Sequence, residues 1–405
     1  MPVYLFATLD TKGTEAAFVR DVLRRAGVET RLVDTGCLGE PTVAPDVSRA
    51  EVFAAAGTSL EVVRAKGDRG EAVTRAAEGA ARLAELWHRE GKLAGAMGLG
   101  GSAGTTIGTA AMRALPLGVP KLMVSTLASG EVSHYVGAKD VCMLNAVVDI
   151  SGINRVSRRV LTRAAQAMAG MVNGGAIAEG DDRPVIAATM FGVTTPCVER
   201  ARKVMESAGY EVLVFHATGV GGKAMESLIR DGVIAGVLDI TTTELADENV
   251  GGFLTAGPTR LTAAGSLGIP QLVSVGALDM ANFHGIDSVP ERFRARKLHR
   301  HNANVTLMRT TPEENRRIGA DLGRKVSSAK GPTAVLLPRR GVSAIDREGQ
   351  PFDDPQARAA LFAAIREHAG AVPVRELDLH INDPEFAEAC ASTLLGLLRV
   401  KAQRS

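Results

Sequence analysis

The sequence predicts an α/β protein of two tandem Rossmann-like domains, each a doubly wound parallel sheet, because one pattern occurs twice along the chain. Residues 3–27 and 185–209 each contain an apolar strand, a Thr-rich turn and an amphipathic helix that ends in Ala-Gly. Both copies continue into a second strand, a small-residue strand with a polar loop, and a Gly-x-Pro step into another strand. We therefore expect the functional site to lie in a cleft between two pseudo-repeated domains, where the loops after the strands converge.

Each expected strand is short, apolar and followed by Gly, Thr or Asp, as buried parallel strands usually are. The first domain covers residues 1–175, with strands expected at 3–8, 30–34, 93–97, 121–124 and 141–146. The second domain covers residues 184–405, with strands expected at 185–189, 212–216, 234–239, 271–275, 334–338 and 374–379. Helices are expected between the strands, and the small, acidic stretch 174–184, which ends in Pro, is expected to link the domains.

Composition limits the classes of function. Hydrophobic residues make up 45% of the 405 residues but are too dispersed for a membrane span, and no signal peptide is expected before the first strand. The four cysteines lie far apart without a CxxC pair, which argues against disulfides and structural zinc and favours a cytoplasmic protein. A net charge of +2 and an aromatic content of 4% give no reason to expect a nucleic-acid or membrane partner.

The clearest ligand-binding motif is the loop GLGGSAGTT at residues 98–106, which follows an apolar strand and precedes a helix. Its glycines let backbone N–H groups converge at a helix N-terminus, where an anion such as phosphate is favoured. The loop lacks the Gly-Lys-Ser/Thr ending of a Walker A motif. No acidic residue lies in the expected region at 117–126, which disfavours NAD. The simpler alternative is a tight turn without a ligand.

The loop after the first strand, TLDTKGTE at residues 8–15, carries three candidate binding residues. Asp10 can hold a metal ion or ribose hydroxyls, Lys12 can neutralise phosphate, and Thr11 can donate to a phosphate or cap the helix. The alternative is helix capping alone, with the charged side chains in solvent. Convergence with the glycine loop at one edge of the sheet favours binding.

The segment after the fourth strand adds Ser125 and Thr126 as hydroxyl donors at the strand end. Asp140, in the same polar segment, can ligate Mg²⁺ together with Asp10, or cap a turn. Lys66 and Arg69 precede a helix and are either cations of the site or ordinary surface charges.

In the second domain, the loop LDITTTELADE stands where the first domain has its glycine loop. Its Asp239 and Glu244 suit a polar organic substrate or a divalent cation better than a phosphate, although capping hydroxyls and carboxylates explain the loop equally well. His301 and His380 lie in polar loops and are candidate acid–base groups. These four residues form the candidate catalytic set.

Long sequence blocks, including TLDTKGTE, GLGGSAGTT, VSTLASGE, VVDISGIN, TMFGVTTPCV, GVLDITTTELADE and HNANVTLMRTT, carry a family resemblance. Along essentially its whole length the chain resembles an uncharacterised bacterial and fungal family that shares its sequence with the ATP-binding inhibitory domain of the tomato mosaic virus resistance protein. The resemblance implies two subdomains, ATP with Mg²⁺ on the first, and a homodimer. Carried over by position, the ATP site comprises Asp10, Thr11, Lys12, Gly100, Gly101, Ser102, Gly104, Thr105, Thr106, Ser125 and Thr126.

One departure from the family pattern is visible, because the glycine loop usually reads GGSGGT and this chain has Ala103. A methyl group there is tolerable if Ala103 keeps a negative φ. The preferred hypothesis is an enzyme of phosphoryl-transfer or ligase type that uses ATP and Mg²⁺ on a small polar metabolite. The alternative is a nucleotide-responsive dimeric module without catalysis, and a metal-independent hydrolase or lyase that holds a substrate phosphate also stays open.

Overall fold

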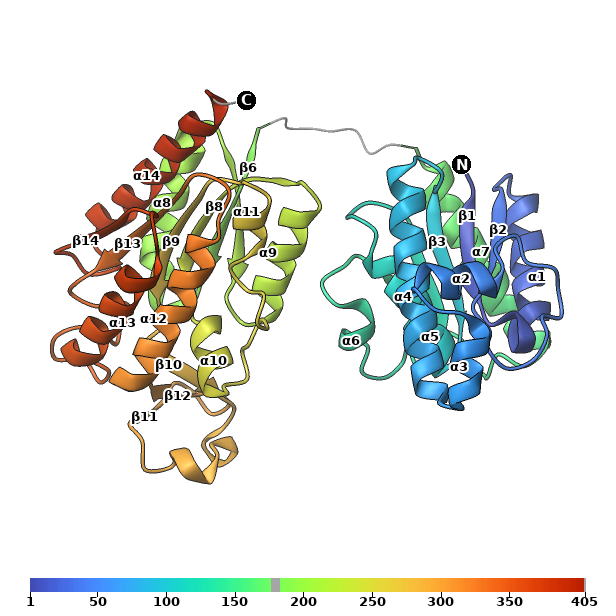
Figure 1. The fold of residues 1–405 in the computed structure, drawn as a ribbon, viewed down its shortest axis with the longest axis horizontal. Coiled ribbons are helices and arrows are strands. Elements are labelled where there is room, and N and C mark those ends of the chain that lie inside the picture. Colours follow the sequence, from blue (N-terminus) through green and yellow to red (C-terminus); the bar gives the residue numbers. More distant parts are fainter. Residues whose placement is uncertain (176–182, 404–405) are drawn as a thin grey trace. The chain divides into compact units, whose positions relative to one another are not determined.

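The computed structural model describes residues 1–175 and 183–403, and it divides into two compact units, Met1–Glu179 and Gly180–Ser405. Each unit is an α/β sandwich around its own parallel sheet (Figure 1). Most of the expected linker, residues 176–182, lies outside the described part of the chain. Among the described helices, none combines the length and apolar character needed to cross a bilayer.

Unit 1 contains a five-stranded, fully parallel sheet in the order β2-β1-β3-β4-β5. Every residue of the three inner strands is buried, which matches their apolar sequences. The chain order reverses beside β1, whose neighbours are β2 and β3, so this is the topological switch point of the sheet. The strands are β1 (Val3–Ala7), β2 (Thr30–Asp34), β3 (Gly95–Gly100), β4 (Lys121–Ser125) and β5 (Cys142–Asn145).

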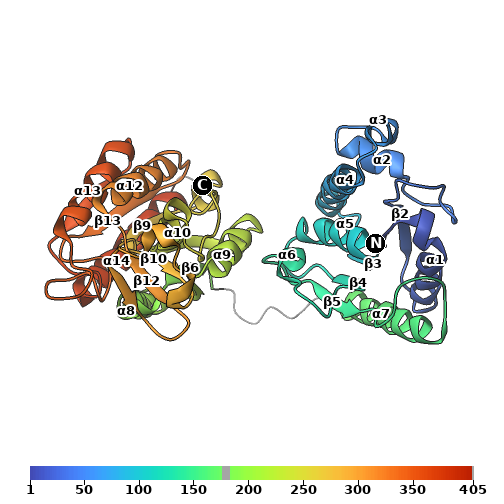
Figure 2. The same cartoon turned by 90° about the horizontal axis from the view of Figure 1, so that it is seen from below.

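Helices cover both faces of this sheet (Figure 2). On one face lie α1 (Leu9–Arg25) and α7 (Arg155–Asn173), packed on the aliphatic side chains of the central strands. The other face carries α2 (Arg49–Ala55), α3 (Leu60–Lys66), α4 (Arg69–Arg89) and α5 (Ser102–Arg113). The short α6 (Ser133–Val136) follows β4. Helix α2 begins with a capping box in which the Ser48 side chain accepts from the Glu51 N–H, so the helix starts where the sequence indicates.

Unit 2 repeats this topology in a six-stranded parallel sheet of order β14-β13-β9-β8-β6-β7. Its first four strands in the chain correspond in order and position to β1, β2, β3 and β4 of unit 1, as the repeated sequence pattern predicts. The strands are β6 (Val185–Met190), β7 (Glu211–His216), β8 (Ile234–Thr241), β9 (Gln271–Gly276), β13 (Thr333–Pro338) and β14 (Val374–Leu377).

The helices of unit 2 also form two layers. One layer is α8 (Thr195–Ser207) with α14 (Pro384–Ala402). The other contains α9 (Val220–Arg230), α10 (Glu244–Val250), α11 (Ala263–Ser266), α12 (Pro312–Ser327) and α13 (Pro355–His368).

A small antiparallel sheet follows β9 and has no counterpart among the predicted strands. It consists of β10 (Met280–Phe283), β12 (Thr306–Arg309) and β11 (Leu298–Arg300). These strands are three or four residues long and stand among polar residues and prolines, so their apolar pattern is too short to distinguish a strand from a loop.

Candidate functional site

A cavity of about 270 Å³ opens at the carboxyl ends of β1, β2 and β3 in unit 1, which is the switch point of the sheet. We call it the switch-point cavity. Its walls come from the loops that follow these three strands, from α4 and α5, and from the loop after β5. It is lined by Thr8, Asp10, Thr11, Lys12, Thr35, Cys37, Leu38, Arg69, Ala72, Val73, Gly101, Ser102, Ala103, Gly104, Ile107 and Asp149.

The N-terminus of α5 forms one wall of the cavity. Gly101 is its N-cap residue, and among the described residues no side chain caps the first turn, so its N–H groups are available to a ligand. The turn from β3 into α5 is tight, since a Cβ on Gly100 would come within 2.8 Å of the Gly104 Cα. Ala103 lies inside the helix and has no positive φ, so its methyl group is accommodated without strain.

The loop from β1 into α1 forms the base of the cavity. The Asp10 carboxylate accepts the N–H groups of Leu38 at 2.9 Å and Gly39 at 3.3 Å, which joins this loop to the loop after β2. Lys12 has non-helical dihedral angles that kink α1, and its ammonium group donates to the Ile150 carbonyl oxygen. The cation is therefore anchored, and Lys12 shares the lining of one cavity with the N-terminus of α5.

A buried ion pair holds the loop after β2 in place. Arg49 Nε donates to Asp34 Oδ2 at 2.6 Å, and both side chains are at least nine-tenths buried. Asp34 Oδ1 also accepts the N–H of Leu9 at 3.1 Å and that of Gly36 at 2.9 Å. The carboxylate therefore fixes the loops after β1 and β2 relative to each other.

Two charged lining residues were not selected as site residues from the sequence alone. Asp149 follows β5 at the same edge of the sheet as Asp10, and Arg69 is exposed on the first turn of α4. The sequence is compatible with Arg69 as either a cation of the site or a surface charge, and in the structure Arg69 lines the cavity. Lys66, the other candidate cation, instead pairs with Glu71 at 2.6 Å.

The metal pair expected from the sequence does not form, because Asp140 lies at the opposite edge of the sheet from Asp10. Asp140 precedes β5 and accepts from Lys121 Nζ at 2.7 Å and from the Gly118 N–H at 2.9 Å, both near the amino end of β4. Although partial burial raises its pKa, the hydrogen bond from Lys121 gives a net lowering. Asp140 is thus a structural partner of Lys121.

Six of the eleven expected nucleotide-binding residues line the cavity, and the other five do not. Thr105 and Ser125 are buried and share a hydrogen bond of 2.7 Å between their hydroxyls. The Thr106 hydroxyl donates to the Ser102 carbonyl oxygen at 2.9 Å. Gly100 permits the tight turn, and Thr126 is the nearest neighbour of a Cβ built on Gly101, at 3.7 Å. These five residues therefore belong to the strand ends, loops and helix around the cavity without lining it.

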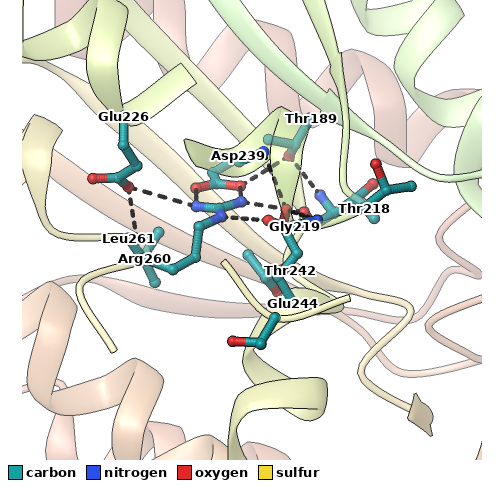
Figure 3. Close-up of polar contacts among 12 residues, drawn as sticks. Thr189, Thr218, Gly219, Glu226, Asp239, Thr242, Glu244, Arg260 and Leu261 are labelled. Atoms are coloured by element: carbon teal, nitrogen blue, oxygen red, sulfur yellow. Dashed lines mark hydrogen bonds and ion pairs between the residues drawn. The ribbon is translucent and has the colours of Figure 1, made fainter. Parts of the chain in front are cut away.

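In unit 2, the expected catalytic residues Asp239 and Glu244 belong to a buried cluster around Arg260 (Figure 3). Arg260 is 1% exposed. Its Nη1 and Nη2 donate to the two Asp239 oxygens at 2.5 and 2.6 Å, and its Nε donates to Glu244 Oε2 at 2.5 Å. Glu226 Oε1 lies 3.8 Å from Nη1. We call these four residues the Arg260 cluster.

Hydrogen bonds from the backbone complete the Arg260 cluster. Glu244 Oε1 accepts the N–H groups of Gly219 at 2.7 Å and Gly222 at 3.1 Å, at the start of α9. Burial lowers the pKa of Arg260, but the neighbouring carboxylates, Asp239 first, raise it above its ordinary value. Burial raises the pKa of Glu226. Because these partners are internal, the cluster is a structural assembly that holds the loops after β7 and β8.

The two candidate histidines lie apart from the Arg260 cluster. His301 is exposed beyond β11, with its N–H bonded to the Val305 carbonyl oxygen. His380 is 6% exposed, and both ring nitrogens contact backbone: Nε2 lies 2.9 Å from the Ser343 carbonyl oxygen, and Nδ1 accepts the Asn382 N–H at 3.1 Å. Burial lowers the pKa of His380, and these bonds suit the neutral ring. The structure does not bring the four catalytic candidates together.

The fold and the cavity define a two-unit, Rossmann-like α/β protein whose first unit carries a preformed cavity at its switch point. The chain belongs to the uncharacterised protein family UPF0261: the model of its N-terminal domain matches residues 1–176, and that of its C-terminal domain matches residues 183–398.

Relatives match over the whole chain or most of it. A UPF0261 protein of Clostridium tetani is 50% identical over 398 residues, which is 98% of each chain. A UPF0261 protein of Rhizobium meliloti is 47% identical over 96% of this chain and 97% of its own. The ToMV resistance protein Tm-1 of Solanum lycopersicum is 44% identical over 81% of this chain, which corresponds to 44% of that plant protein.

Proposed function

We propose that unit 1 binds ATP together with Mg²⁺ in the switch-point cavity. The observation that carries this proposal is the uncapped N-terminus of α5, which lines the same cavity as Lys12, whose ammonium group is anchored. Unpaired N–H groups and the positive end of the helix dipole favour a phosphate there, and Lys12 and Arg69 add two positive charges. The switch point is also the usual ligand position in open α/β sheets.

The rest of the lining suits the nucleoside part of ATP. Leu38, Ala72, Val73 and Ile107 give one part of the cavity an apolar wall, which a purine ring can cover. A lining that combines a helix N-terminus and charged groups with an apolar wall fits a phosphorylated aromatic ligand better than a free phosphate. The family resemblance implies the same ligand.

The carboxylates of the cavity fit a metal that arrives with the nucleotide. Asp10 and Asp149 both line the cavity, and Mg²⁺ in nucleotide sites is commonly held by one or two carboxylates and by phosphate oxygens. Within residues 1–175 and 183–403, no group of three or more Asp, Glu, His or Cys side chains is arranged to hold a metal ion. We therefore expect Mg²⁺ to bind weakly without ATP.

A second part of the proposal concerns whether the bound ATP is consumed in a reaction. An enzyme of phosphoryl-transfer or ligase type would use the bound ATP on a small polar metabolite, and a dimeric regulatory module would change its state without consuming ATP. The internal partners of Asp239, Glu244 and His380 favour the module, because none of these groups is free to transfer a proton. Intact ATP that tightens a homodimer in sizing experiments would support the module, and hydrolysis stimulated by a metabolite would support the enzyme.

The first test is calorimetric titration of ATP with Mg²⁺ into the wild type and Lys12→Ala, with ADP and NADH as comparison ligands. We expect selective ATP binding and a loss of at least tenfold in the variant, because a charge-assisted contact to phosphate is removed. Lys66→Ala is the matched control, since Lys66 is a nearby cation outside the cavity. Arg69→Gln provides a second variant at an exposed position, in case the Lys12 contact with Ile150 is needed for folding.

Absence of ATP binding to the wild type would overturn the proposal. Equal binding by the wild type, Lys12→Ala and Arg69→Gln would also overturn it, because the nucleotide would then lie elsewhere.

A further inference from the structure

Thr35 carries a buried hydroxyl that no other group in the described part of the chain binds. The residue follows β2, lines the switch-point cavity and is 2% exposed. Its Oγ1 has no hydrogen-bond partner within the described residues. Buried hydroxyl groups are normally hydrogen-bonded, so an unpaired one at a cavity wall points to a partner that the ligand supplies.

The backbone holds this hydroxyl in a fixed place. The Thr35 N–H donates to the Ala7 carbonyl oxygen at 2.9 Å, and the preceding residue is Asp34, which is paired with Arg49. The residue is therefore tied to β1 on one side and to the buried ion pair on the other. A polar group positioned before the ligand arrives loses little conformational entropy on binding, which is typical of recognition groups.

Strand order places Thr35 away from the proposed phosphate position. The sheet order is β2-β1-β3, and neighbouring strands lie about 5 Å apart, so the ends of β2 and β3 are roughly 10 Å apart. Phosphates at the N-terminus of α5, after β3, would put the sugar of a nucleotide toward β1 and β2. Thr35 therefore stands on the nucleoside side of the cavity.

Asp10 lies next to this position. A Cβ built on Gly36, the residue after Thr35, would be 2.7 Å from the Asp10 carboxylate. A hydroxyl and a carboxylate on adjoining loops match the two hydroxyls of a ribose, and carboxylates bind ribose hydroxyls in other nucleotide sites of parallel sheets.

We infer that the Thr35 hydroxyl bonds a ribose hydroxyl of the nucleotide, with Asp10 as its neighbour, and makes the cavity selective for ribonucleotides. The inference rests on the proposed function and deepens it, since it assigns the class of nucleotide. It also leaves Asp149 as the carboxylate for Mg²⁺.

The test is calorimetric titration of the Mg²⁺ complexes of ATP, 2′-deoxy-ATP, 3′-deoxy-ATP and inorganic tripolyphosphate into the wild type, Thr35→Val and Thr35→Ser. We expect the wild type to bind ATP about tenfold more tightly than at least one deoxy analogue. Thr35→Val should bind ATP only as tightly as that analogue, and Thr35→Ser should keep the preference. Tripolyphosphate should bind all three proteins equally.

The variants also report on folding. Because the native hydroxyl has no partner among the residues that the structure describes, Thr35→Val should unfold thermally at or above the temperature of the wild type. Equal affinity of the wild type for ATP and both deoxy analogues would overturn the inference. It would also be overturned if Thr35→Val preferred ATP over the deoxy analogue as strongly as the wild type does. In both cases ATP binding itself, and the proposed function, would stand. Failure of the wild type to bind either ATP or tripolyphosphate would overturn both.

Discussion

The two units share one sheet topology, but the ends of corresponding strands border a cavity in unit 1 and are filled by a side chain in unit 2. In unit 1, the first turn of α5 has no cap and lines a cavity. In unit 2, the carboxylate of Glu244, the first residue of α10, accepts N–H groups at the start of α9, the helix that follows β7, and it is also bound to Arg260. Glu244 follows β8, the counterpart of β3, so a side chain of the protein occupies the region where unit 1 has its cavity.

This comparison teaches that the repeated fold fixes which strand ends meet, while individual side chains decide whether a ligand can enter between them. In unit 2, the Glu244 carboxylate satisfies the donors at the start of α9 as a bound anion would. If ATP binds as proposed, the titration should therefore show one nucleotide per chain. A measured stoichiometry of two would contradict the interpretation that Glu244 fills the second position.

The largest expected effect comes from breaking the Arg260 cluster with Arg260→Met. The change leaves Asp239, Glu244 and Glu226 buried without their cation, and losing one partner of a buried ion pair typically costs about 3–5 kcal/mol. We expect the unfolding transition of unit 2 to shift in urea while that of unit 1 stays unchanged.

Arg202→Met is the matched control, because Arg202 makes an exposed pair with Glu206 on α8 and should change stability by less than about 1 kcal/mol. The defect of Arg260→Met should shrink at acidic pH, where the stranded carboxylates take up protons. A variant as stable as the control would show that the cluster is not what holds the loops of unit 2.

The second-largest effect is expected in the pH dependence of the stability of unit 2, and it arises from Asp247 on α10. Burial raises its pKa to about 7, despite hydrogen bonds from the backbone and side-chain nitrogens of Asn282 at 2.7 Å. The folded protein therefore keeps a proton on Asp247 between pH 4 and 7, where the unfolded chain has lost it. Its contribution to stability is fully present below about pH 4 and is lost as the pH rises to 7.

Asp247→Asn should remove this pH dependence, which amounts to at most about 4 kcal/mol for a shift of this size. The substitution is compatible with the site, because the buried Asn282 Oδ1 has no partner in the described structure and can accept from the new amide. Urea unfolding from pH 4 to 8 measures the difference, and Asp287→Asn at an exposed position provides the control. Parallel profiles for the wild type and Asp247→Asn would refute the assignment.

The sequence predicted the fold well because buried parallel strands are short apolar runs that end in polar loops. All eleven predicted strands correspond to strands of the two parallel sheets. The small antiparallel sheet was missed, since three or four residues carry too little periodicity. The Rossmann-like class is indicated by strands that alternate with helices along the sequence. Because this pattern occurs in both halves of the chain, it indicates the same fold class twice.

The candidate site was harder to predict, because lining a cavity depends on strand order and on which edge a residue occupies. Asp140 and Asp149 flank the same strand, β5, but only the residue after the strand reaches the edge that carries Asp10. The predicted strand at 141–146 already held that information. Thr35 could be found only once β2 was known to lie beside β1, and no motif surrounds Arg260 to indicate that it neutralises Asp239 and Glu244.

The smallest change in stability is expected from Gly101→Asp, which would give unit 1 an internal carboxylate like that of Glu244. Gly101 is the N-cap of α5 with a negative φ, and a Cβ there meets nothing closer than Thr126 Oγ1 at 3.7 Å. An aspartate can cap the helix and complement its dipole, so the unfolding free energy should rise by about 0.5 kcal/mol. The same carboxylate should repel phosphate and weaken ATP binding at least tenfold.

Gly101→Asn separates charge from shape, because asparagine caps a helix about as well and has nearly the same size. Both variants should melt slightly above the wild type, while calorimetry should show a much larger loss of ATP affinity for Gly101→Asp. If the two variants bound ATP equally, the positive end of α5 would not be what attracts the nucleotide. An added carboxylate would then not convert the open arrangement of unit 1 into the filled one of unit 2, and the contrast between the units would have to depend on cavity shape alone.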